Sequence, residues 1–155
     1  MVNNQEAISL ATQIQQIDHL TEHFYLFKGF DAEHYFKADA LQQLFFGDGH
    51  LVDASFVKPM EFTLASFSQA ISKQIEEGNA QFFVQQEIAD KTHIHGHIAQ
   101  RLSVYEYTNT KDTQVKWKRG VNLIHYIYID KRWLITAMIW QDESKDSPIN
   151  ESYLS

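Results

Sequence analysis

The strongest constraint on this chain is a pair of long strand-like runs near its C-terminal end. Residues 115–129 and 132–142 are rich in Val, Ile, Tyr and Trp, which favour extended backbone. Only the polar pair Asp130-Lys131 separates the two runs, which predicts a tight hairpin. In a regular strand Trp133 and Trp140, seven residues apart, would lie on opposite faces. Apolar residues occupy both faces, so we expect helices to cover one face and a second copy of the chain, in a homodimer, to cover the other.

The first half of the chain reads mainly as helix. Between Glu6 and Phe27 apolar residues recur every three or four positions, as on one face of an amphipathic helix. Gly29 suits the end of that helix, and Thr63 could cap another. The remaining elements that we expect are short helices in 31–46, a strand at 50–55, a helix over 63–77, and strands over 80–89 and 92–108 joined by a turn at Asp90-Lys91.

Helices followed by hairpin-connected strands predict the α+β class. We expect a cone-shaped, curved and mainly antiparallel sheet with about three helices packed on its concave face. Residues 1–143 should form a single domain, because no linker or repeat interrupts them. The polar residues 144–155 should form a flexible C-terminal tail.

The composition excludes several functional classes. The net charge of −7 opposes nucleic-acid binding, which needs a basic face. The absence of Cys excludes disulfides and zinc–thiolate sites. No apolar run approaches the length of about 18 residues that crosses a membrane, and the N-terminus lacks a signal-peptide pattern. We therefore expect a cytoplasmic protein with neither nucleic-acid nor membrane partners.

Four short segments, taken in order, carry a resemblance to a known family. They are Leu44-Phe-Phe-Gly-Asp-Gly-His-Leu-Val52, Ala99 to Glu106, Arg119-Gly-Val-Asn122, and Arg132-Trp-Leu-Ile135 with Trp140 and Glu143. Across roughly residues 6–143 the chain resembles the nuclear transport factor 2-like superfamily, which includes ketosteroid isomerase, scytalone dehydratase and polyketide cyclase-like proteins. It looks most like small, largely uncharacterised bacterial members. The resemblance implies a cone with a pocket, but not one activity, because this fold hosts many functions.

The resemblance to ketosteroid isomerase implies a general-base aspartate on the first strand. Counting from Phe46 places Ala54 at that position, with Asp53 one residue away. A shift of one residue turns a strand side chain to the opposite face. Either the base is missing or the register differs by one. Asp53 and His97 are the candidate acid/base residues, with a surface aspartate at a strand end as the alternative for Asp53.

The run His93-Ile-His95-Gly-His97 places imidazoles at alternate positions. In one unbroken strand all three would share a face. Such a set could bind zinc with help from His50, His125 or Glu87. The alternatives are a solvated or interface patch at a hairpin end, and an acid/base role in a pocket. We predict no bound metal and no cofactor.

Seven residues are candidates for lining the cavity of the cone. We expect at least three of them to line one enclosed space of a few hundred Å³; they are Phe24, Phe27, His50, His95, Tyr105, Asn122 and Trp140. The function that we expect is non-catalytic or accessory binding of a small, mostly apolar organic molecule. The alternative is a cofactor-free isomerase, dehydratase or cyclase that uses His, Asp and Tyr for acid–base chemistry.

Overall fold

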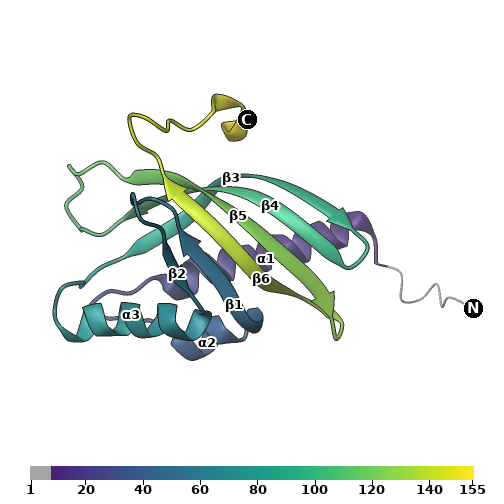
Figure 1. Ribbon diagram of the computed structural model, residues 1–155, viewed down its shortest axis with the longest axis horizontal. Coiled ribbons are helices and arrows are strands. Elements are labelled where there is room, and N and C mark those ends of the chain that lie inside the picture. The colour runs from purple at the N-terminus through teal and green to yellow at the C-terminus, as the bar shows by residue number, and fades with distance from the viewer. Residues whose placement is uncertain (1–7) are drawn as a thin grey trace, which may run out of the picture.

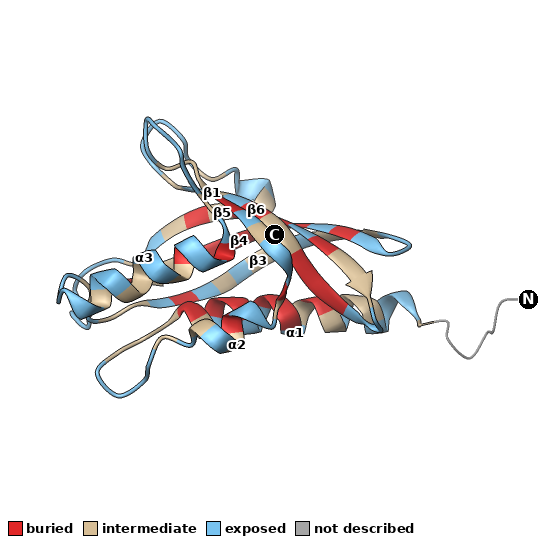
Figure 2. Ribbon diagram, turned by 60° about the horizontal axis from the view of Figure 1, so that its bottom comes forward, coloured by how far each residue is buried: buried red, intermediate tan, exposed pale blue. Residues whose placement is uncertain are grey.

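Three helices lie on one side of a curved sheet in the computed structural model, which describes residues 8–155 (Figures 1 and 2). Helix α1 spans Leu10–Lys28, α2 spans Ala38–Gln42 and α3 spans Leu64–Glu76. Ser9 caps α1 by accepting a hydrogen bond from the backbone N–H of Thr12. The predicted start of this helix at residue 6 lies outside the described residues. Thr63 caps α3 as predicted, in a reciprocal capping box with Ser66.

The sheet has six strands in the order β2-β1-β6-β5-β4-β3 and does not close. Among the strand pairings within residues 8–155, only that of β1 with β6 is parallel. The predicted α+β class is therefore confirmed, whereas the short β2 was missed and β1 begins earlier than predicted. The strands are β1 Phe45–Asp53, β2 Met60–Phe62, β3 Val84–His95, β4 Ile98–Thr108, β5 Lys118–Ile129 and β6 Arg132–Asp142.

The two long hairpins differ in how well their turns were predicted. Asp130 and Lys131 form the β5–β6 turn with φ of 52° and 66°, the positive values that a two-residue hairpin turn favours. The predicted turn at Asp90-Lys91 is wrong, because β3 continues through both residues to His95. The chain instead reverses at Gly96, whose φ of 56° suits a residue without a Cβ.

One extra residue in β6 changes which way its side chains point. Thr136 has no partner in the pairing with β5, so the alternation of faces shifts there. Trp133 and Trp140 consequently both face the helices, which corrects the prediction of opposite faces. Trp133 packs against Tyr128 with ring centroids 5.4 Å apart, and Trp140 packs against Phe67 at 5.8 Å.

The concave side of the sheet holds the core, including Phe24, Leu51 and Ile124. Burying such side chains stabilises the fold by about 1.5–3 kcal/mol each. A buried cation, Arg101, is 2% exposed. Its guanidinium contacts the carboxylates of Glu87, Asp18 and Asp90. Burial opposes the charge of Arg101, but the Glu87 and Asp18 carboxylates raise its pKa above the usual value.

The convex face of the sheet keeps apolar side chains in solvent. Ile98, Leu123 and Ile139 are 59%, 47% and 44% exposed. In the tail, Glu151–Leu154 form the short 3-10 helix η2, which contacts β3. The flexibility of residues 144–155 stays a prediction. Within residues 8–155, no helix has the length and apolar character needed to cross a membrane.

Candidate functional site

A cavity of about 350 Å³ lies between α3 and the concave face of the sheet, beside the C-terminal end of α1. Three apolar residues come from α3, because a helical stripe faces the sheet, and four aromatic side chains come from the surrounding segments. The apolar lining consists of Phe30, Phe62, Phe67, Ala70, Ile71, Ala80, Phe83 and Trp140. Such a mostly apolar chamber with a few polar groups is typical of small-molecule sites.

Lys28, the last residue of α1, brings an amine into this chamber. Its Nζ donates a hydrogen bond to Gln85 Oε1 at 2.8 Å. Four aromatic rings surround the Nζ atom, with centroids 5.2–5.7 Å away in Phe24, Phe67, Phe83 and Trp140. Burial lowers the pKa of Lys28 to about 8, against the opposing effect of the Asp142 and Asp53 carboxylates.

Asp142 holds two tyrosines at the sheet side of the cavity. The hydroxyl of Tyr105 donates to Asp142 Oδ1 at 2.6 Å, and that of Tyr107 donates to Oδ2 at 2.7 Å. Burial and these hydrogen bonds to a carboxylate raise the pKa of both phenols above the usual value. The tyrosines therefore stay neutral. The ring of Tyr105 lies across Gly120, its cross-strand neighbour on β5.

Asp53, the last residue of β1, also lines the cavity. It lies opposite Trp140 on the parallel neighbour β6 and two residues after the buried Leu51, so it shares their face. Its Oδ1 accepts a hydrogen bond from the backbone N–H of Ser55 at 2.9 Å. The carboxylate at the end of β1 that lines the cavity is thus Asp53, while Ala54 is the next residue along the chain.

No protein-family model matches this sequence. No curated protein matches it either. Solved structures do. A protein of unknown function with a cystatin-like fold from Nostoc punctiforme is 13% identical, with a TM-score of 0.69 over 90% of this chain and 97% of that one. An NTF2-like protein of unknown function from Shewanella baltica is 10% identical, with a TM-score of 0.63 over 90% and 100%.

A third solved structure is described as a putative Ca/calmodulin-dependent kinase II association domain, from Exiguobacterium sibiricum. It is 10% identical, with a TM-score of 0.58 over 89% of this chain and 96% of that one. The chain has a nuclear transport factor 2-like fold. At these identities the likeness extends to the fold alone, so the site must be argued from its own residues.

In this nuclear transport factor 2-like fold, Tyr105 and Trp140 line the cavity, as does Asp53. That is two of the seven pocket candidates rather than the expected three. Phe24 is a buried core residue, and Phe27 packs against the core. Asn122 is buried, with its Nδ2 3.5 Å from the hydroxyl of Tyr25, while its Oδ1 has no partner among the described residues.

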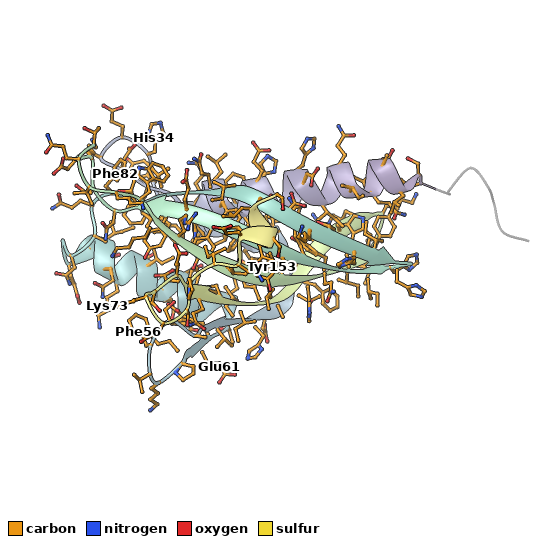
Figure 3. All side chains as sticks on the ribbon, turned by 90° about the horizontal axis from the view of Figure 1, so that it is seen from above. His34, Phe56, Glu61, Lys73, Phe82 and Tyr153 are labelled. Atoms are coloured by element: carbon orange, nitrogen blue, oxygen red, sulfur yellow. The ribbon has the colours of Figure 1, made fainter. Side chains whose placement is uncertain are left out.

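None of the predicted histidines lines this cavity. His50 points to the other side of β1, where its Nε2 lies 2.6 Å from Oε1 of Glu61, a residue at the edge of the molecule (Figure 3). His95 is exposed at the end of β3. His97 lies in the turn, with its ring 5.6 Å from that of Tyr128. Because the strand ends at His95, the predicted alternation does not reach His97.

The proposed metal alternative for these histidines has no geometric support in residues 8–155. No three His, Cys, Asp or Glu side chains in that part of the chain are arranged to hold a metal ion. His93 and His95 lie on β3, where alternate residues share the convex face. His97 does not join them as a third ligand, because the turn at Gly96 takes it out of the strand.

Sequence reasoning missed Lys28, Gln85 and Asp142. A signal for Lys28 was available, because Leu20, Phe24 and Lys28 are spaced four apart and so continue one helical stripe. A cation on an apolar stripe at the end of a helix points inward with its neighbours. Gln85 and Asp142 carry no comparable signal, since their facing depends on the strand register.

Proposed function

We propose that the protein binds a small, mostly apolar organic molecule in this cavity, as a ligand-binding or accessory domain. The observation that carries the proposal is the composition of the lining. Aromatic and aliphatic side chains supply most of it, while Lys28, Gln85 and Asp53 supply polar atoms for a ligand's functional group. Aromatic rings bury large areas at small entropic cost, which favours a flat or cyclic ligand body.

The binding test uses fluorescence of an apolar dye such as anilinonaphthalene sulfonate, followed by displacement with small apolar compounds. Ala70 lies on α3 and lines the cavity, so Ala70→Trp should fill the space and weaken dye binding by about tenfold or more. Ala65 is an exposed residue of the same helix outside the cavity, so Ala65→Trp is the matched control. Equal dye affinity in both variants would refute the proposal.

A cofactor-free acid–base enzyme is the second candidate, and the position of Asp53 favours it. A carboxylate in an apolar chamber can accept a proton from the carbon next to a carbonyl. The catalytic base would be Asp53, without a histidine. Deuterium exchange at the α-carbon of a cavity-bound ketone, measured by NMR, tests this. Asp53→Asn should abolish the exchange while dye binding persists, and unchanged exchange would eliminate the candidate.

We also propose that two copies associate through the convex face. Ile98, Leu123 and Ile139 lie on β4, β5 and β6 and give this face exposed apolar side chains that a second copy could cover. One structural neighbour is described as an association domain. Sedimentation equilibrium should give twice the chain mass, and Leu123→Glu should give a monomer. A monomeric wild-type protein at tens of micromolar would contradict the proposal.

A further inference from the structure

Lys28 is a buried primary amine beside open volume. The residue is 9% exposed, and it lines the cavity. Within residues 8–155 no carboxylate forms an ion pair with it, and Gln85 is its hydrogen-bond partner. Lysines are almost never this buried unless they are paired. Three carboxylates surround the charge of the buried Arg101. Lys28, in contrast, has no such ion pair among the described residues to compensate a positive charge.

The surroundings of Lys28 favour its reactive form. Burial lowers the pKa to about 8 from 10.5, so roughly half of the molecules carry a neutral amine at pH 8, against well under about 1% for an ordinary lysine. A neutral amine in an apolar pocket is a nucleophile toward carbonyl carbon. A flat aromatic or conjugated partner in the cavity would meet the rings of Phe67, Phe83 and Trp140, which line it.

We propose that Lys28 forms an imine with a small apolar aldehyde or ketone that enters the cavity. This inference rests on the proposed function and specifies the ligand as a carbonyl compound. The reaction involves only the amine of Lys28, the carbonyl compound and proton transfers. The amine lone pair forms the C–N bond while the carbonyl π pair moves to oxygen, which takes a proton. The carbinolamine then loses its N–H proton and its hydroxyl, which leaves as water.

The proton transfers have a carrier in the same chamber. The carboxylate of Asp53 lines the cavity and can accept the proton from nitrogen and return it to the departing hydroxyl. The net reaction joins amine and carbonyl and releases one water. It needs no oxidant, reductant or added proton. Tyr105 and Tyr107 are committed to Asp142, so Asp53 is the cavity carboxylate without a tyrosine donor.

The test is reductive trapping on the full chain. The protein is incubated with para-methylbenzaldehyde, reduced with borohydride, digested and mapped by mass spectrometry. Lys28 should carry the para-methylbenzyl adduct at least about tenfold more than Lys73, because burial of Lys28 favours its neutral amine. Lys73 is an exposed lysine of α3 (Figure 3). The yield at Lys28 should rise from about pH 6.5 to about pH 8.5.

Two matched methionine variants test whether the adduct depends on Lys28. Lys28→Met keeps a long apolar side chain and should lose the dominant adduct, whereas Lys73→Met should keep it. Adducts spread over exposed lysines, with no excess at Lys28, would overturn the proposal on the wild-type protein alone, even if Lys28→Met fails to fold.

A second probe separates this inference from the proposed function. Para-methylbenzyl alcohol has nearly the same shape but cannot form an imine. If the alcohol displaces the dye and the aldehyde leaves Lys28 unmodified, imine formation is refuted and ligand binding stands. If neither compound binds and no apolar competitor displaces the dye, both proposals fail.

Discussion

Gly120→Ala should be among the most destabilising single-methyl additions in this protein. A Cβ at Gly120 would lie 2.1 Å from the hydroxyl oxygen of Tyr105, 2.3 Å from its Cζ and 2.7 Å from the carbonyl oxygen of Gln141. All three contacts are far inside van der Waals distance. Tyr105 is 1% exposed and its hydroxyl is bound to Asp142, so moving the ring away from the added methyl group breaks that hydrogen bond.

The magnitude follows from two costs and one small gain. Overpacking a filled interior costs about 1–3 kcal/mol. Displacing Tyr105 breaks its hydrogen bond to the Asp142 carboxylate, which costs about 1.5–3 kcal/mol. Replacing glycine in a strand returns about 0.5–1 kcal/mol. The net loss should be about 2–5 kcal/mol, a large part of a stability of about 5–15 kcal/mol.

Urea unfolding followed by circular dichroism measures this loss as a lower midpoint. The second arm repeats Gly120→Ala in a Tyr105→Leu background, where the clashing hydroxyl and ring atoms are gone. There the additional cost should fall by about half or more, because two of the three nearest atoms, the hydroxyl oxygen and Cζ of Tyr105, are gone. A loss below about 1 kcal/mol in the wild-type background would refute the packing argument.

Three further predictions concern charged groups. Arg101→Leu should lower the free energy of unfolding, measured by urea titration, by about 3–5 kcal/mol, because it leaves the Glu87 carboxylate without its cationic partner. A loss under about 1 kcal/mol would contradict this. Between pH 8 and 10.5 the unfolded chain holds a proton that folded Lys28 has released, so stability should rise with pH by up to about 3 kcal/mol relative to Lys28→Met. Parallel pH profiles would disprove it. Asp142→Asn should cost about 1–3 kcal/mol, because an amide has one acceptor for the hydroxyls of Tyr105 and Tyr107; an unchanged urea midpoint would count against it.

The class of fold was predictable because it depends on periodicity. The apolar stripe of α1, the capping residue of α3 and the polar pair at 130–131 are local signals, and each marks the element found. The turn between β3 and β4 was misplaced because Asp-Lys resembles a turn locally. Asp90 is instead held in the strand by its tertiary contact with Arg101.

The site was less predictable, because its residues meet only through register. Tyr105 and Trp140 were found from their aromatic character within strands. Asp53 was ambiguous, because a count along the chain cannot say which of two neighbours faces inward. His50 was wrongly favoured as a pocket residue for the same reason: its side chain lies on the other face of β1, next to Glu61.

The unpaired Thr136 shifts the alternation of side chains in β6 by one residue. Before it, odd-numbered positions face the helices; after it, even-numbered positions do, including Met138 and Asp142. The residues of β6 before Thr136 and those after it therefore alternate with opposite parity. Deleting Thr136 would leave both halves facing as they do, whereas a regular strand that kept it would turn Ile139 and Gln141 to the cavity wall in place of Trp140 and Asp142. Any alignment of this chain with structural neighbours at 10–13% identity has to account for the unpaired Thr136 before residues beyond it can be compared.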